Sequence, residues 1–235
     1  MAKTGQPSRE RIASTRRSLE ILDVLAEGGP LGTNEIARRT GTTASTVSRQ
    51  LGTLVAARLV EHVPESGRYR LGIRLVELAS AVLRRLDVRA IARPHLEELV
   101  AEVGETATLS VSGEPDAITV DLVRTHHYVQ GATQLGRPSI AHATAAGKVM
   151  LAFGRRPAKA PLRSYTDATI TSVPELEREL ELIRERGWAD AYEEREEGLN
   201  AIAAPVFGSD STLAAIVALQ GPVPRFGRAG ERKAL

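Results

Sequence analysis

Apolar residues recur at helical spacing in three segments near the start of the chain. The first stripe spans residues 19–25, and the Gly-Gly-Pro sequence at residues 28–30 ends it. Two shorter helices follow, with Gly41 in the turn between them. Thr33 is expected to cap the earlier helix and Thr43 to open the later one. Two short helices joined by a glycine-containing turn predict a helix-turn-helix.

The last of these helices has an outer face that is typical of DNA contact. Val47, Leu51 and Leu54 form its inner face, while the outer positions carry short hydroxyls, one guanidinium and one amide. Short hydroxyls let a DNA backbone come close, and the two longer side chains can bond base edges. We expect DNA contacts from Thr43, Ser45, Thr46, Ser48, Arg49, Gln50 and Thr53.

Residues 59–72 alternate between apolar and polar positions on both sides of a Pro-Glu-Ser-Gly turn. This period predicts a β-hairpin, the wing of a winged helix-turn-helix. Arg68 and Arg70 project together, either onto DNA phosphates or as an ordinary solvated edge, and beside such a helix we favour phosphate contact. Residues 15–72 are therefore expected to form the DNA-binding domain, preceded by a flexible arm at residues 1–14.

A strongly apolar helix is expected at residues 73–87. Its apolar stripe is wider than burial on one side requires. Either a second copy of the chain or the chain's own second domain would have to cover it. We expect a homodimer, with these residues as its linker and dimerisation helix. The stripe consists of Leu75, Val76, Leu78, Ala79, Val82, Leu83 and Leu86.

The second half of the chain mixes helical and strand-like patterns, which predicts an α+β domain at residues 88–235. The expected helices cover residues 94–103, 145–153 and 172–187, and the expected strands cover residues 106–112, 117–123, 199–207 and 213–219. Ser172 and Glu175 form an S-x-x-E capping box for the last helix. The strands are expected to pair into an antiparallel sheet flanked by the helices.

Composition excludes much of protein chemistry. The absence of cysteine rules out thiolate metal sites, cysteine nucleophiles and disulfides. His126 and His127 are adjacent and would face opposite sides of a strand, so no metal site is expected. The glutamate-rich run at residues 193–197 could hold a metal or act as a general acid, but such runs are usually solvated. We expect no cofactor and no catalytic residue.

Charge differs between the two halves of the chain. Residues 1–87 carry 14 Lys and Arg against 9 Asp and Glu, whereas residues 88–235 carry 17 against 20. A basic front half suits a polyanionic partner such as DNA. No apolar block is long enough for a membrane span or a signal peptide. We therefore expect a cytoplasmic protein without a membrane partner.

The chain resembles the IclR family of bacterial transcription regulators in four stretches. These are SLEILDVLAEGGPLGTNEIARRTGTTASTVSRQLGTL, GRYRLG, AHATAAGKVMLA, and GLNAIAAPVFGSDSTLAAIVALQGP with the preceding ERGWADAYEE. The resemblance implies a winged helix-turn-helix, a linker helix that pairs protomers, and a GAF-like effector domain. It also implies homodimers that can pair into a dimer of dimers. Family members usually carry a further helix where residues 227–235 are short and polar, which favours the dimer here.

The helix that begins at Ala145 is the candidate effector site. Its first N–H groups, at Ala145, Ala146 and Gly147, have no partner inside the helix and attract anions. The alternative is that these small residues only permit close packing of the helix on the sheet. The resemblance implies organic acids as effectors. It places the opposite wall of the site at Glu193, Ala201, Ala218 and Gln220.

Alanine at positions 201 and 218, where family members often carry polar side chains, implies a larger and more apolar cavity. We expect a carboxylate of more than three carbons, such as a hydroxybenzoate. Three functions stay open: a ligand-responsive transcription regulator that binds operator DNA, a DNA-binding protein whose second domain only oligomerises, and a DNA-binding module fused to a small-molecule enzyme. We expect the first.

Overall fold

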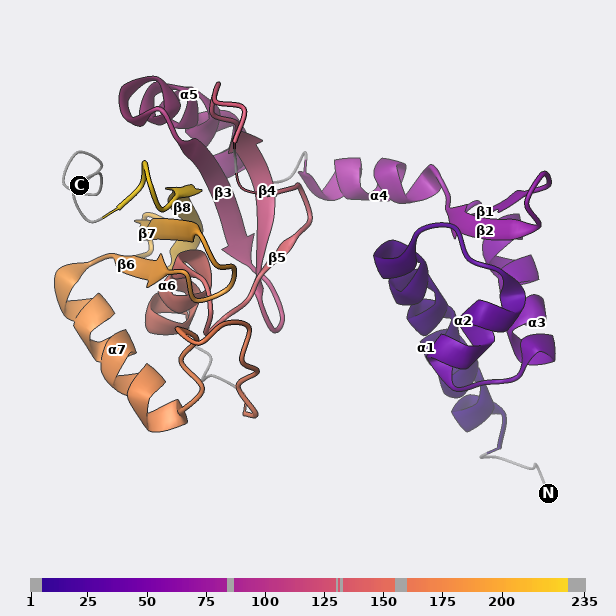
Figure 1. Cartoon of the computed structure of the whole chain (residues 1–235). Helices are drawn as coiled ribbons and strands as arrows, with labels where there is room; N and C mark the ends of the chain where they lie inside the picture. Colours follow the sequence, from indigo (N-terminus) through magenta and orange to yellow (C-terminus); the bar gives the residue numbers. More distant parts are fainter. Residues whose placement is uncertain (1–5, 84–86, 130, 132, 155–159, 228–235) are drawn as a thin grey trace. The chain divides into compact units, whose positions relative to one another are not determined.

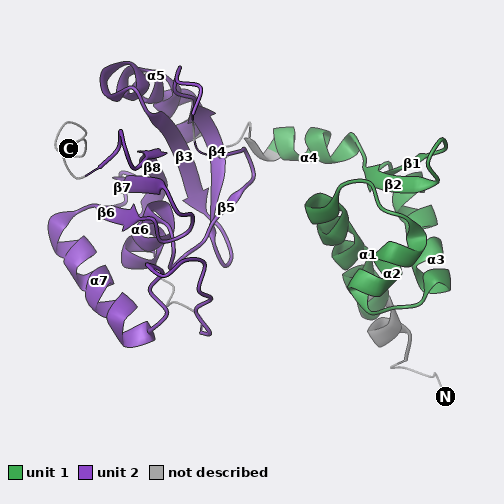
Figure 2. Ribbon diagram, viewed as in Figure 1, with its two compact units in different colours: residues 1–85 green, residues 86–235 purple. Residues whose placement is uncertain are grey.

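The computed structural model of the chain describes residues 6–83, 87–129, 131, 133–154 and 160–227 (Figure 1). The chain forms two compact units, residues 1–85 and residues 86–235 (Figure 2). Each unit buries its own cluster of apolar side chains. Among the described residues, no helix combines the length and the apolar character needed to cross a membrane.

The first unit is a winged helix-turn-helix, as expected. Its elements are α1 (Gln6–Gly28), α2 (Thr33–Thr40), α3 (Ala44–Ala56), β1 (Val60–Val63), β2 (Arg68–Leu71) and α4 (Arg74–Leu83). β1 and β2 pair antiparallel, and Leu31 adds a bridge to the wing through two backbone hydrogen bonds with Tyr69, at 2.9 and 2.8 Å. Ile21, Ile36, Val47 and Leu51 are at most 1% exposed and join the three helices at one core.

Two expectations at helix ends in this unit are wrong. The flexible arm expected over residues 1–14 is helical from residue 6, since α1 begins at Gln6; residues 1–5 lie outside the described part. Proline is tolerated in a first helical turn, so Pro7 does not stop the helix there. Thr33 is the first residue of α2 rather than its cap, because the carbonyl of Gly32 accepts the first helical hydrogen bonds.

The end of the wing is joined tightly to α4. The N–H of Gly72 donates to the Leu59 carbonyl at 2.8 Å, and a Cβ at position 72 would lie 2.3 Å from the Arg58 carbonyl oxygen, so only glycine fits. The Arg58 guanidinium also donates to Glu77 of α4 at 2.6 Å. These contacts set the direction in which α4 leaves the wing.

Helix α4 covers Arg74–Leu83, within the helix expected at residues 73–87; residues 84–86 of that range lie outside the described part, and residue 87 belongs to the helix that follows. Its apolar side chains face solvent in the described structure: Val76 is 58% exposed, Leu78 is 47% exposed, and Ile73 just before the helix is 58% exposed. Leu75 is half-buried and Ala79 is exposed. The side chains of Val82 and Leu83, and all of Leu86, lie outside the described part.

The second unit is an α+β domain built on a six-stranded antiparallel sheet with strand order β5-β4-β3-β8-β7-β6. Its strands are β3 (Thr106–Ser112), β4 (Ala117–Val123), β5 (Pro138–Ser139), β6 (Ala189–Tyr192), β7 (Leu199–Phe207) and β8 (Leu213–Pro222). Its helices are α5 (Asp87–Val103), α6 (Ala145–Phe153) and α7 (Val173–Arg186). The expected antiparallel sheet with flanking helices is confirmed.

Helices cover both faces of this sheet (Figure 1). Ala218 of β8 lies in the core formed with α6 and α7. Its neighbours Val217 and Leu219 point to the opposite face, where they lie beside Leu99 of α5. α6 is buried along almost its whole length between the sheet and α7, which fixes the position of its N-terminus against the strands.

Three features of this unit differ from the expected elements. Helix α5 already covers residues 87–93 ahead of the expected start at Pro94, and Arg89 and Arg93 in this part bind the buried Asp121 of β4 at 3.4 and 3.1 Å. The short strands β5 and β6 were not predicted, since they contain two and four residues. Ser172 is the N-cap of α7, but its side chain makes no capping hydrogen bond, so the prediction of a capping box is wrong.

Candidate functional sites

The outer face of α3 presents short polar groups around one arginine. Thr43, Ser45, Ser48, Arg49 and Thr53 are exposed, and Thr46 is half-buried. Thr43 caps the helix by accepting the Thr46 N–H at 3.3 Å. Within the described part of the chain, the Arg49 guanidinium makes no hydrogen bond and no ion pair. This face therefore offers an uncommitted guanidinium among hydroxyl groups.

Gln50 departs from the expected face. Its side chain is only 5% exposed and lies between α3 and α1. Its Nε2 donates to Ser14 Oγ at 2.9 Å, while its Oε1 accepts from Ser18 Oγ at 2.6 Å. The expectation that Gln50 faces outward to read a base is wrong, because both ends of its amide hold α3 on α1.

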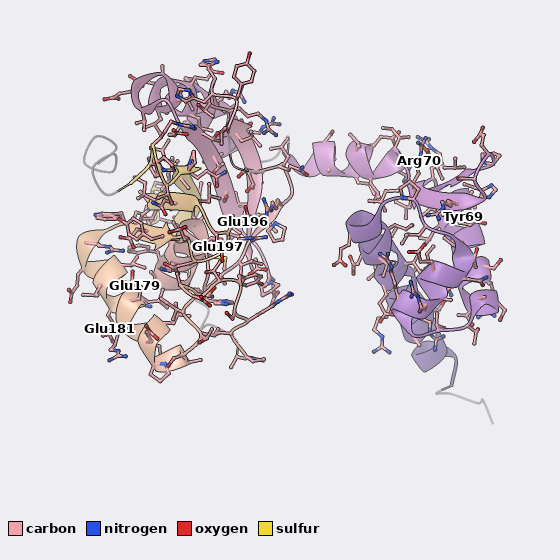
Figure 3. All side chains as sticks on the ribbon, viewed as in Figure 1. Tyr69, Arg70, Glu179, Glu181, Glu196 and Glu197 are labelled. Atoms are coloured by element: carbon pink, nitrogen blue, oxygen red, sulfur yellow. The ribbon has the colours of Figure 1, made fainter. Side chains whose placement is uncertain are left out.

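The two wing arginines are exposed but engaged with neighbours. Arg68 donates to the Pro30 carbonyl at 2.8 Å and lies 3.9 Å from Glu35. Arg70 donates to Glu61 across the hairpin at 3.0 Å. Figure 3 shows Tyr69 and Arg70 on the wing. Exposed ion pairs contribute little free energy, so phosphate groups can compete for both guanidiniums.

In the second unit, a cavity of about 80 Å³ lies at the N-terminus of α6. Residues of all six strands line it, together with residues 133 and 137 before β5 and the loop at residues 194–196. The lining residues are Thr108, Thr119, Thr133, Arg137, Pro138, Ser139, Ala143, Thr144, Ala145, Ala146, Ala191, Glu194, Arg195, Glu196, Leu199, Ala201, Ala218 and Gln220.

Five of the residues predicted for the effector site line this cavity: Ala145, Ala146, Ala201, Ala218 and Gln220. The alanines of β7 and β8 lie on the same face because Ala201 pairs with Gln220 and Ala203 with Ala218. The amide of Gln220 donates to the Thr133 hydroxyl, which ties the sheet to the loop at the cavity edge.

Gly147 and Glu193 do not line the cavity. A Cβ at position 147 would lie 2.3 Å from the Ile140 carbonyl oxygen, so Gly147 permits close packing of the helix on the preceding turn. Its N–H is taken by Thr144 Oγ1 at 3.0 Å. Glu193 has a φ of 55° and accepts the Gly198 N–H at 2.7 Å, so its carboxylate closes a turn instead of facing a ligand.

The interior neighbour of Glu193 was missed from the sequence. Glu194 is 8% exposed and lines the cavity, and its Oε1 accepts a hydrogen bond from Lys148 Nζ at 2.5 Å. Lys148 also donates to the Asp190 carbonyl at 3.0 Å. A lysine in the otherwise apolar helix AAGKVMLAF was the available signal, because a buried ammonium requires a partner.

Charged groups on the loops complete the lining. Arg137 pairs with Glu196, and Arg195 donates to the Pro138 carbonyl at 2.8 Å. Figure 3 labels Glu196 and Glu197 on this loop. Burial lowers the pKa of Arg195, and the charge of Arg137 lowers it further. Burial raises the pKa of the Glu194 carboxyl above its ordinary value of 4.5, and the Lys148 charge and hydrogen bond offset part of that rise.

A winged helix-turn-helix joined to a separate α+β unit that holds a cavity is the arrangement of two-domain transcription regulators. Two family models match the chain: the IclR helix-turn-helix domain over residues 14–64, and the bacterial transcriptional regulator IclR C-terminal domain over residues 80–235. The chain belongs to the IclR family of DNA-binding transcription regulators.

Relatives cover most of the chain. The HTH-type transcriptional regulator BhcR of Paracoccus denitrificans is 34% identical over 91% of this chain and 79% of its own length. The transcriptional repressor IclR of Escherichia coli is 30% identical over 93% of this chain and 83% of its own length.

A crystal structure of an IclR homologue from Microbacterium hydrocarbonoxydans, complexed with 4-hydroxybenzoate, is similar to this chain with a TM-score of 0.76. The alignment covers 94% of this chain and 95% of the homologue at 22% sequence identity. At this identity the similarity supports the two-unit fold.

Proposed function

We propose that this chain is a ligand-responsive transcription regulator whose affinity for operator DNA is changed by a small organic acid bound in the second unit. The observation that carries the proposal is the cavity at the N-terminus of α6. Thr144 caps the Gly147 N–H, so Ala145 and Ala146 are the residues whose N–H groups an anion would take. Their small side chains allow a carboxylate to approach.

The volume and lining of the cavity suit a compact acid. The cavity measures about 80 Å³. Ala201 and Ala218 supply an apolar wall for the body of the acid, while Arg137 and Arg195 add positive charge at the side. The 4-hydroxybenzoate complex of the Microbacterium homologue makes hydroxybenzoates a suitable first set of compounds.

For DNA binding we propose the exposed face of α3 and the wing. Arg49 would read a guanine edge, with the hydroxyls of Thr43, Ser45, Ser48 and Thr53 beside the DNA backbone. Arg68 and Arg70 would contact phosphates. The exposed apolar face of α4 supports a homodimer paired through this helix, since Val76 and Leu78 are not covered by the rest of the first unit.

The effector proposal is tested by operator binding with and without acids. An operator fragment is selected from genomic DNA, and its affinity is measured with benzoate-type and short aliphatic acids, each beside its amide. The acid should change the affinity and the amide should not, because the amide lacks the charge that the helix end stabilises. A tenfold change corresponds to a coupling free energy of about 1.4 kcal/mol between the two sites.

Matched alanine-to-phenylalanine variants locate the site. Ala201→Phe fills the cavity and should abolish the response, while operator affinity without acid stays unchanged. Ala214→Phe makes the same change at an exposed position of β8 outside the cavity lining and should keep the response. Equal binding of acids and amides, or an unchanged response in Ala201→Phe, would contradict the proposed site and favour a second unit that only oligomerises.

A further inference from the structure

Glu194 has one carboxylate oxygen without a partner. Its side chain is more than nine-tenths buried, and Oε1 is engaged by Lys148 Nζ at 2.5 Å. Its Oε2 is buried and has no hydrogen-bond partner among the described residues. A buried polar atom without a partner costs stability, so such an atom in a native site calls for an explanation.

The position of Glu194 explains why its Oε2 has no partner. The residue lines the cavity proposed for the effector, on the loop that faces the N-terminus of α6. The terminal torsion of a glutamate is soft, so a small rotation of the planar carboxylate, which moves both oxygens together, can adjust Oε2 to a ligand in the cavity. A bound molecule with a hydrogen-bond donor would then satisfy Oε2.

We propose that Glu194 determines effector specificity by accepting a hydrogen bond from a hydroxyl group, so that the effector is a hydroxylated monocarboxylic acid. This inference rests on the proposed function of the cavity. A carboxylate on the α6 end and a hydroxyl on Glu194 give the ligand two polar anchors, and the alanine wall contacts the apolar part between them.

Charge balance favours a hydroxyl over an ammonium group as the donor. The Lys148–Glu194 pair is neutral, and among the remaining charged lining residues Arg137 and Arg195 face the single carboxylate of Glu196. The site therefore carries one surplus positive charge. One ligand carboxylate neutralises this surplus positive charge. An ammonium group on the same ligand would bring the surplus back, and an uncompensated charge in a poorly solvated site costs free energy.

Matched acids test the proposal by calorimetric titration of the full chain. One series is 2-hydroxybutyrate, butyrate and 2-oxobutyrate, and the other is 4-hydroxybenzoate, benzoate and 4-fluorobenzoate. In at least one series the hydroxy acid should bind about tenfold or more tightly than both analogues that lack the donor, as expected for a hydrogen bond to a charged group.

Glu194→Gln keeps the size of the side chain and an oxygen for Lys148, but places an N–H donor where Oε2 was. The preference for the hydroxy acid should disappear, and an analogue with a hydrogen-bond acceptor in place of the hydroxyl should bind more tightly than it does to the wild type. Glu193→Gln makes the same change one residue earlier, where the side chain accepts the Gly198 N–H outside the cavity, and should keep the wild-type preference.

The outcomes separate this inference from the proposed function. Binding of acids without a hydroxyl preference in either wild-type series overturns the role of Glu194 and leaves the acid site standing. A hydroxyl preference that survives in Glu194→Gln also overturns it. Absence of binding by every acid overturns the proposed function together with this inference. If Glu194→Gln fails to fold, the wild-type comparison still tests the inference, because the absence of a hydroxyl preference overturns it.

Discussion

Replacing Gln50 with alanine should loosen the contact between α3 and α1. The substitution removes the hydrogen bonds to Ser14 and Ser18, at 2.9 and 2.6 Å. Each such bond contributes about 1 kcal/mol net, so the free energy of unfolding of the first unit should fall by about 2 kcal/mol. The two serines are half-buried, so their hydroxyl groups can form hydrogen bonds with water in the variant. The loss of unfolding free energy therefore stays at about 2 kcal/mol.

The effect on DNA binding should follow from this mechanical role. Gln50→Ala should weaken binding to all operator variants by a similar factor, because α3 is positioned less firmly. Arg49→Ala should leave stability within about 0.5 kcal/mol of the wild type, since this side chain has no partner in the described structure. It should lose about 1–3 kcal/mol of discrimination at one base pair.

Urea unfolding combined with titrations against single-base operator variants distinguishes the two variants. Gln50→Leu serves as a control for volume, since it keeps the buried contacts without the amide. If Gln50→Ala kept wild-type stability and lost specificity at a single base pair, the assignment of Gln50 as a helix anchor would be refuted.

Three further predictions concern the wing, α4 and the buried pair. Arg68→Ala should weaken binding to all sequences alike and reduce the slope of log affinity against log salt by about 0.9, which a base-specific loss would contradict. Val76→Glu should yield monomers in sedimentation at micromolar concentration, and a monomeric wild type would refute the dimer. The raised pKa of Glu194 means that its stabilising contribution is fully present below its ordinary 4.5 and is lost as pH rises through the raised pKa. Across this interval the wild-type Tm should therefore fall relative to that of Glu194→Gln, and parallel Tm profiles would contradict it.

Local sequence pattern was sufficient for the elements that form the scaffold of both units. The helix at residues 145–153 and the strands at residues 106–112 and 117–123 lie where the pattern places them. Their apolar periodicity and turn residues agree with the packing that each element finally adopts. The five predicted cavity residues on α6, β7 and β8 followed from the family resemblance and the same elements.

The charged and polar partners were decided by the tertiary structure. Helical periodicity placed Gln50 on the outer face of its helix, and only the hydrogen bonds to Ser18 and Ser14 of α1 showed that its amide lies inward. The choice between Glu193 and Glu194 has a similar origin. The left-handed backbone at Glu193 ends the alternation of the preceding strand β6, so the second glutamate enters the interior and meets Lys148. The periodicity of a sequence predicts which side chains share a face only where the backbone keeps a regular helix or strand geometry. At a residue where the backbone leaves that geometry, the periodicity no longer predicts which side chain points inward.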